Sequence, residues 1–339
     1  MAPHVLSNLA VAIMAAAALA LIATARHRPW WRELARDLYR RRPVAVAVVG
    51  VYLLIGGLDS VAWVGGTPPQ GDLVAQYEPR SVIDRLFPPD FRESSYSAPL
   101  AANEFYGGAP LRFPGRHLLG TDLLGRDVLL QTLKGVRVAL LIGGASSLIV
   151  IPIALLAGMS AGYFGRRIDD VVFFVIATLS SIPALLLLIA LVMALGRGTL
   201  QVCIALGITS WVGFSRVIRG ETLKLRELDY VAAARALGSG HGRILRRHIL
   251  PNLMHLVVIT FVLLFSRLVL SEAVLSWLGI GINGSWGQMI DQARDELARD
   301  PVVWWNLGAA SLALFGLILS VNLLGDAVRD VLDPRTLRE

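Results

Sequence analysis

Apolar residues along this chain gather into long blocks that are separated by polar segments. Each block spans roughly 20 residues or more, which is the length an α-helix needs to cross the hydrocarbon core of a bilayer. A helix also satisfies its own backbone hydrogen bonds, which lipid cannot do. The pattern therefore predicts an all-α polytopic membrane protein. The seven candidate spans are residues 5–25, 44–66, 136–161, 171–195, 199–218, 253–281 and 303–325.

The composition favours the same class of protein. Of the 339 residues, 55% are hydrophobic and only 17% are charged, against about a quarter in soluble domains. The single cysteine, Cys203, lies inside an apolar block, so we expect a small buried residue and neither a disulfide framework nor a cysteine metal site. A net charge of +7 would suggest nucleic acid in a soluble protein. In a membrane protein the positions of the cations matter more, and no nucleic-acid partner is expected.

Arginines are concentrated in alternate connecting segments. Loops rich in Lys and Arg stay in the cytoplasm, so the basic linker 26–43 is predicted inside, and the alternation of spans assigns the rest. The inside segments, with Arg216, hold 20 Lys and Arg against 11 acids, whereas the outside segments, with Arg137, hold 11 against 12. This predicts an N-terminus outside and a C-terminus in the cytoplasm. The inside segments are 26–43, 162–170, 219–252 and 326–339, and the outside segments are 67–135, 196–198 and 282–302.

The first apolar block has two interpretations. Residues 23–25 read Ala-Thr-Ala, which resembles the cleavage site of a signal peptide, but the preceding residues carry no Lys or Arg. Cleavage would also leave the basic segment 26–43 outside, against the charge bias. We therefore expect residues 1–25 to be a retained extra transmembrane helix.

The segment 67–116 differs from the other connections. It holds eight prolines with interleaved aromatic residues, and it has neither a helical period nor a long apolar run. A disordered linker is one interpretation, but the aromatic residues argue against full disorder. We expect an ordered loop or small cap on the outer side.

Motifs of catalysis are absent from the sequence. The only lysines, Lys134 and Lys224, do not belong to a G-x-x-x-x-G-K-[ST] phosphate loop, and no H-E-x-x-H or G-x-S-x-G appears. His241 and His248 lie seven residues apart without a neighbouring carboxylate or cysteine, so we interpret them as surface residues rather than metal ligands. The chain is not expected to be an enzyme, and no cofactor or metal site is predicted.

The inside segment 219–252 is more patterned than a simple connection. Apolar spacing predicts a helix from Glu221 to Leu237, which Gly238 would end because glycine adopts the left-handed conformation readily. A second short helix is predicted from Ile244 to Leu250, ended by Pro251. Its arginines could lie on anionic lipid, or the segment could dock a cytoplasmic partner.

This segment resembles the EAA loop of ABC importer permeases. Ala233, Ala234, Gly238, Leu250 and Pro251 match that pattern, but Ala232 stands where the family has glutamate. No role of that glutamate is therefore carried over. The resemblance makes 219–252 the ATPase-coupling loop. Its candidate residues are Ala233, Ala234, Arg235, Gly238, Gly240, Arg243, Leu250 and Pro251.

A second stretch, HLLGTDLLGRDVL at 117–129, resembles the L-G-T-D-x-x-G-R-D segment of the second ("C"-type) permease of peptide and nickel importers. Residues 271–290 and 322–334 resemble later helices of the same family, and the likeness covers about 44 to 335. The segment could be a salt-bridged cap on the next helix, part of a periplasmic gate, or a rest for a binding protein. Its candidate residues are Gly120, Thr121, Asp122, Gly125, Arg126 and Asp127.

Two residues inside the apolar blocks are further candidates. Glu272 is costly in a membrane unless it faces a partner or the bundle interior, so it either packs against a neighbouring helix or subunit or lines a cavity. Pro183, with Ser180 and Ser181, predicts a kink in the span 171–195.

The resemblance implies the permease subunit of an ATP-driven importer, with a six-helix ABC importer permease core at 44–325. The extra helix 1–25 and the linker 26–43 precede it. The first core helix is 44–66, the proline-rich periplasmic segment belongs to 67–135, five more helices occupy 136–325, and the tail is 326–339.

Partners and cargo follow from the resemblance as well. It implies a second homologous permease, two ATPase subunits that hold ATP and Mg²⁺, a periplasmic or lipid-anchored binding protein, and the lipid of a bacterial cytoplasmic (inner) membrane. Peptides are the expected cargo, with nickel, glutathione and oligosaccharides as alternatives. An ion-driven secondary transporter would show inverted repeats, which the sequence lacks, and a structural membrane anchor would need neither Glu272 nor the kinked span.

Overall fold

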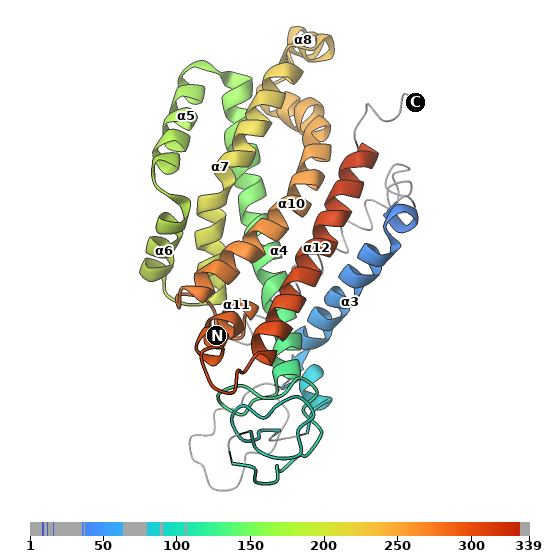
Figure 1. Cartoon of the computed structure of the whole chain (residues 1–339). Helices are drawn as coiled ribbons and strands as arrows, with labels where there is room; N and C mark the ends of the chain where they lie inside the picture. Colours follow the sequence, from blue (N-terminus) through green and yellow to red (C-terminus); the bar gives the residue numbers. More distant parts are fainter. Residues whose placement is uncertain are drawn as a thin grey trace. The chain divides into compact units, whose positions relative to one another are not determined.

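A computed structural model describes residues 9, 12, 16, 36, 38–63, 80–88, 91–105 and 107–332 (Figure 1). Apart from residues 9, 12 and 16, the predicted extra helix at 1–25 lies outside these described residues, as do most of the linker 26–43 and the end of the tail.

Six of the seven predicted spans correspond to helices in the described residues. Five helices are long and apolar enough to cross a membrane, and a bent pair, α5 with α6, supplies a sixth candidate. The prediction of an all-α polytopic membrane protein is confirmed. The helices are α3 (Pro43–Ser60), α4 (Val128–Phe164), α5 (Arg166–Ser181), α6 (Ala184–Leu195), α7 (Thr199–Arg226), α10 (Leu250–Trp277) and α12 (Trp305–Leu332).

The predicted kink at Pro183 is a complete break. The axes of α5 and α6 meet at 90°, and Ile182 between them is extended, with φ −94° and ψ 130°. A residue before proline avoids the helical region because the proline ring clashes with it, so the helix ends there. Ser181 Oγ donates to the Thr178 carbonyl at 2.7 Å and takes up one of the last carbonyls of α5.

The contacts divide the chain into two compact units. Unit 1 comprises residues up to Ile142 together with Val269–Leu323, and unit 2 comprises Gly143–Leu268 together with the residues from Leu324. Several helices pass from one unit into the other, but each unit has its own set of close contacts.

Unit 1 combines helical segments with a cap made mostly of turns. The cap contains a short antiparallel pair, β1 (Ala62–Trp63) with β2 (Arg80–Ser81), and a 3₁₀ turn at Ile83–Arg85. In its described residues, the proline-rich segment is therefore an ordered cap.

Later in the chain, unit 1 contains α11 (Trp286–Glu296). Ser285 caps its start, and the Ser285 side chain accepts a hydrogen bond from the Gln288 N–H.

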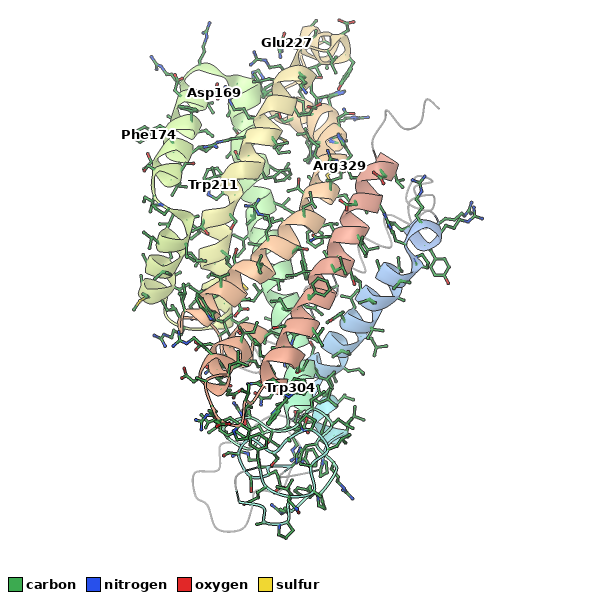
Figure 2. The ribbon with its side chains drawn as sticks, in the orientation of Figure 1. Asp169, Phe174, Trp211, Glu227, Trp304 and Arg329 are labelled. Atoms are coloured by element: carbon green, nitrogen blue, oxygen red, sulfur yellow. The ribbon has the colours of Figure 1, made fainter. Side chains whose placement is uncertain are left out.

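Unit 2 is built on a close approach of α4 and α7. A Cβ on Gly158 would lie 2.6 Å from the Ser215 carbonyl oxygen, and one on Gly162 would lie 2.8 Å from that of Arg219. Only glycine lets the two backbones approach so closely, which is how helices pack within membranes. Both oxygens of Asp169 on α5 pair with Arg219, and Figure 2 marks Asp169 at that end of α5.

Two shorter helices complete unit 2. They are α8 (Asp229–Ala236) and α9 (His241–Ile244), and a π-helical turn at Leu245–Ile249 joins α9 to α10.

Candidate functional site

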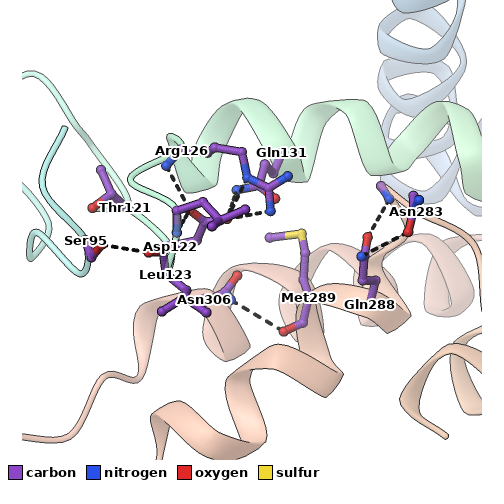
Figure 3. Close-up of polar contacts among 12 residues, drawn as sticks. Ser95, Thr121, Asp122, Leu123, Arg126, Gln131, Asn283, Gln288, Met289 and Asn306 are labelled. Atoms are coloured by element: carbon purple, nitrogen blue, oxygen red, sulfur yellow. Dashed lines mark hydrogen bonds and ion pairs between the residues drawn. The ribbon is translucent and has the colours of Figure 1, made fainter. Parts of the chain in front are cut away.

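The L-G-T-D segment lies in unit 1 and is organised around one buried carboxylate. Asp122 is 1% exposed. Its Oδ1 accepts the N–H groups of Leu124 and Arg126 at 2.9 and 2.8 Å, and its Oδ2 accepts the Arg126 guanidinium and the Gln131 amide, the latter at 2.9 Å. Figure 3 shows these contacts converging on Asp122. The carboxylate is thus fully used in holding the turn together.

Thr121 ties this turn to two other parts of unit 1. Its hydroxyl accepts the Ser97 N–H at 2.8 Å and donates to the Ser94 carbonyl at 2.9 Å. Its carbonyl accepts the indole N–H of Trp305, at the start of α12, at 2.9 Å. Thr121 therefore joins the cap to a helix far away in sequence.

The two glycines of the motif adopt backbone conformations that other residues avoid. Gly120 and Gly125 have φ values of +71° and +69°. A Cβ on Gly120 would meet the Ser97 carbonyl oxygen at 2.5 Å, and a Cβ on Gly125 would overlap the Glu93 carbonyl oxygen. Both conformation and space require glycine here.

Asp127 caps the start of α4. Its Oδ1 accepts the Leu130 N–H at 2.8 Å, and a carboxylate at this position also complements the helix dipole. Its Oδ2 contacts His117 Nδ1 at 2.8 Å, and the His117 ring lies 4.1 Å from the ring of Phe91. Neither His117 nor Trp305 was a candidate from sequence. Each is too far along the chain from its partner for the spacing of a helix or strand to bring the two together. Of the interpretations of this motif, the geometry is that of the salt-bridged cap.

A cavity of about 550 Å³ opens beside this motif within unit 1. Near it, Lys134 Nζ lies 2.5 Å from Asp84 Oδ1, and the Ser81 N–H donates to Asp84 Oδ2 at 2.9 Å. Burial raises the pKa of Asp84, but the hydrogen bonds from Lys134 and Ser81 outweigh burial, so the pKa lies below its usual range. Asp84 and Lys134 thus form an ion pair within the cap.

Glu272 lies in unit 1 at a joint between two helices. It is 3% exposed, and the Ser276 hydroxyl, one turn later on α10, donates to its Oε1. Ser276 Oγ also lies 3.1 Å from Ser285 Oγ, at the start of α11, and accepts the Ile282 N–H at 3.2 Å. Glu272 is therefore held by groups of its own chain, at the place where α10 turns into α11. It does not border the cavity described above.

Buried Glu296, the last residue of α11, has Asn306 as a partner. Asn306 Nδ2 donates to its Oε1 at 3.3 Å. Burial raises the pKa of Glu296 above its usual range, and the Asn306 hydrogen bond lowers it only in part.

The predicted helix–glycine–helix in unit 2 is present, but its first helix is shorter than predicted. The predicted start at Glu221 is wrong, because Thr199–Arg226 is one continuous helix and the chain turns only at Glu227 and Leu228. Helix α8 then begins at Asp229, which complements the positive end of the helix dipole. Helix α7 therefore continues without interruption until just before the first residue of α8.

Gly238 ends α8 as predicted. Its φ is +75°, its N–H donates to the Arg235 carbonyl at 3.0 Å, and the Ser239 N–H donates to the Ala234 carbonyl at 3.0 Å. This pair of bonds is the Schellman arrangement. Leu237, just before the glycine, is 86% exposed, so the corner presents an apolar side chain to its surroundings.

The prediction that Pro251 ends the second helix is wrong. Helix α9 passes through the π-helical turn into α10, so that residues 241–277 form one helical run, and Pro251 lies inside it. Proline removes an N–H and clashes with the carbonyl four residues earlier in an ordinary helix. The wider turn relieves that clash, and the Leu250 N–H donates to the Leu245 carbonyl instead.

Contacts within unit 2 anchor the loop, and the end of α7 before it, to α4. His241 Nδ1 lies 3.0 Å from the Tyr163 hydroxyl, and the Arg235 guanidinium lies 5.7 Å from the Tyr163 ring centre. Arg226 Nη1 donates to the Gly162 carbonyl at 3.0 Å. Sequence reasoning missed Tyr163, which is buried near the end of a long apolar helix. Ala233, Arg235, Gly240 and Arg243 are exposed, whereas Ala234 is buried.

No cluster of three metal-ligating side chains occurs among the residues that the structure describes. His241, interpreted from sequence as a surface residue, is exposed, and His248, interpreted in the same way, is half-buried. Both also make aromatic contacts: His241 with Tyr163 and Phe164, and His248 with Tyr230.

Comparison with known proteins gives a consistent result. A family model described as "Binding-protein-dependent transport system inner membrane component" matches residues 154–338. The chain is 35% identical to the dipeptide transport system permease protein DppC of Bacillus subtilis over 225 residues, which cover 66% of this chain and 70% of that protein. It is 33% identical to the oligopeptide transport system permease protein OppC of the same organism over 262 residues, covering 75% and 82%.

A third relative is the glutathione transport system permease protein GsiD of Pectobacterium atrosepticum. It is 37% identical over 222 residues, which cover 65% of this chain and 73% of that protein. With the helices and the two motifs described above, these matches show that the chain belongs to the inner-membrane components of binding-protein-dependent transport systems, as a C-type permease subunit of the peptide ABC importer class.

Proposed function

We propose that this chain forms part of the path by which peptides enter a bacterial cell, driven by ATP that partner subunits hydrolyse. The proposed complex contains a second homologous permease, two ATPase subunits with ATP and Mg²⁺, and a periplasmic or lipid-anchored binding protein. The cargo rests on the relatives, whose names give dipeptides, oligopeptides and glutathione. Nickel and oligosaccharides are the weaker alternatives.

The proposed orientation follows the arginines. The segment 219–252 and the C-terminus face the cytoplasm, the cap within 67–135 faces the periplasm, and the N-terminus lies outside. Under this orientation, the core at 44–325 crosses the inner membrane six times, and the L-G-T-D cap lies on the side from which a binding protein delivers cargo.

One observation carries the proposed coupling to the ATPases. Helix α9 runs without a break through the π-helical turn into α10, and only the short corner at residues 237–240 separates α8 from α9. If a moving ATPase displaced this loop, the displacement of α9 would therefore be passed directly to α10, because no flexible segment separates the two helices. Rigid-body movement of this kind is a usual way to switch access to a site.

The exposed side chains of this coupling loop suit a protein partner. Leu237 is almost fully exposed, and Arg235 and Arg243 of the same segment are exposed as well. In this proposal Leu237 packs against the partner, and the guanidinium groups pair with its carboxylates. In this proposal Ala232 supplies no charge, so contact depends on Leu237 and the arginines.

Reconstitution tests the proposal. The chain, a homologous permease and the ATPase subunits are placed in liposomes with the binding protein, and uptake of a labelled peptide is measured with and without ATP. We expect uptake that requires both this chain and ATP. Transport by this chain alone along an ion gradient would overturn the proposal.

A further inference from the structure

The cavity beside the L-G-T-D motif has a mixed lining. Four cationic and two acidic side chains border it, together with the aromatic and proline rings of Phe87, Phe91 and Pro88. Its volume of about 550 Å³ lies within the range of small-molecule sites, roughly 300–1,000 Å³. The cationic lining residues are Arg80, Arg92, Arg126 and Lys134, and the acidic ones are Asp84 and Asp127.

Most of these charges already have partners in unit 1. Lys134 pairs with Asp84, Arg126 pairs with the buried Asp122, and Asp127 contacts His117 and the start of α4. These groups stabilise the cap and leave little capacity for a ligand.

Arg80 and Arg92 differ from the other cations. Neither guanidinium has an ion-pair or hydrogen-bond partner among the described residues, and both side chains are exposed. Arg80 is held in place by β2, where it pairs with Trp63, and Arg92 by a backbone bridge to Arg126. The backbone of each arginine is thus fixed, and two guanidinium groups without a partner among the described residues border a cavity with an apolar wall.

We infer that this cavity binds the carboxylate of a short peptide, with Arg80 and Arg92 as its ligands and Phe87 and Phe91 beside the neighbouring side chain. A guanidinium matches a carboxylate with two parallel hydrogen bonds, which makes arginine the preferred residue for such recognition. The inference rests on the proposed peptide cargo and adds the group of the cargo that is recognised.

The dimensions favour a peptide over a single acidic side chain of a partner protein. One Asp or Glu side chain could pair with the arginines, but it would leave most of the cavity empty. The van der Waals contacts with the aromatic wall would then be missing. A peptide end supplies a carboxylate and an apolar side chain together. The charges and the aromatic wall then contact different parts of one ligand.

Binding of a matched pair of peptides tests the inference. The probes are the tripeptide Ala-Ala-Phe and its C-terminal amide, which differ only in the carboxylate. Each is titrated by calorimetry into the complete transporter in lipid nanodiscs, without the binding protein. We expect the acid to bind at least about tenfold more tightly than the amide, because charge-assisted hydrogen bonds are lost with the carboxylate.

Variants of the complete transporter sharpen the test. Arg80→Gln and Arg92→Gln should each weaken binding of the acid by about tenfold and leave the affinity for the amide unchanged. Arg80→Lys keeps a positive charge, so its affinity for the acid should fall by less. Arg116→Gln, an exposed arginine of the same cap that does not border the cavity, is the matched control and should change neither. Normal nanodisc assembly of each variant shows that the fold is retained.

Equal binding of acid and amide, or acid binding that survives both arginine variants, would overturn the inference. So would variants that weaken docking of the peptide-free binding protein while acid and amide bind alike, because the arginines would then serve that protein. ATP-driven peptide uptake that persists in either case would show that the proposed function stands although the inference fails.

Discussion

The carboxylate of Asp122 accepts both the backbone N–H and the guanidinium of Arg126, so that one pair of residues closes the turn before α4 from two sides. The guanidinium adds a second contact to the same carboxylate at 2.8 Å. Asp122 is almost completely buried, so its charge depends on these partners. We regard this pair as the structural centre of the L-G-T-D cap.

Asp122→Asn should destabilise the cap. The amide keeps the size of the side chain but replaces one acceptor oxygen by a donor that faces guanidinium and amide N–H groups. The free energy of unfolding should fall by about 1.5–3 kcal/mol, the usual value of hydrogen bonds to a charged group. Thermal unfolding of the detergent-purified protein measures it. Asp295→Asn is the control, because that side chain is 84% exposed, and equal melting of both variants would contradict the role of Asp122.

Gly125→Ala should lower the free energy of unfolding more than Gly115→Ala does. Both glycines have φ near +70°, at +69° and +71°, so alanine meets the same backbone penalty of about 1–2 kcal/mol at each. A Cβ at Gly115 has no neighbour within 4 Å, whereas one at Gly125 overlaps a carbonyl oxygen of Glu93. The free energy of unfolding of Gly125→Ala should therefore be about 1–3 kcal/mol lower than that of Gly115→Ala, which is the usual effect of an atom added where there is no space for it. Equal losses in thermal unfolding would show that the close approach to Glu93 is not maintained.

Glu296 should make stability dependent on pH. Its pKa is raised in the folded protein, so the folded state binds more protons than the unfolded state between the usual glutamate pKa and the raised one. Stability contributed by this group is therefore present at lower pH and is lost as the pH rises through that window. Glu296→Gln removes the titration, so its melting temperature should vary less across the window than that of the unchanged protein. Parallel pH profiles would contradict this assignment.

The spans could be predicted from sequence because long apolar runs allow few alternatives in a membrane. The corner at Gly238 could be predicted for a similar reason, since the left-handed conformation favours glycine. The continuation of the helix past Pro251 could not, because the penalty of proline is local and the π-helical turn that relieves it leaves no mark in composition. The Trp305–Thr121 bond could not be predicted either, because its partners are 184 residues apart and no periodicity connects them.

The sequence also placed the L-G-T-D residues together without showing what they contact. Two groups in this part of unit 1, His117 and Trp305, were found only in the structure. That Arg80 and Arg92 have no partner in the described part of the chain depends on the partners taken by the surrounding charges, which one sequence does not reveal.

The central claim is that the loop from α8 to α10 transmits ATPase movement to the spans. Gly238→Pro removes the N–H bonded to Arg235 and forbids the positive φ, and Arg243→Glu reverses an exposed charge of the loop. Arg167→Glu reverses an exposed charge of α5 outside the coupling loop and is the matched control.

The decisive measurement is peptide-stimulated ATPase activity and peptide uptake by the complete complex in liposomes, for these three variants side by side. We predict that Gly238→Pro and Arg243→Glu each lower stimulated activity and uptake by at least about tenfold, as expected for the loss of an interface anchor. Insertion of the permease into the membrane should be normal in all three, and Arg167→Glu should keep full activity. Full ATP-driven uptake by correctly inserted Gly238→Pro and Arg243→Glu would contradict the account.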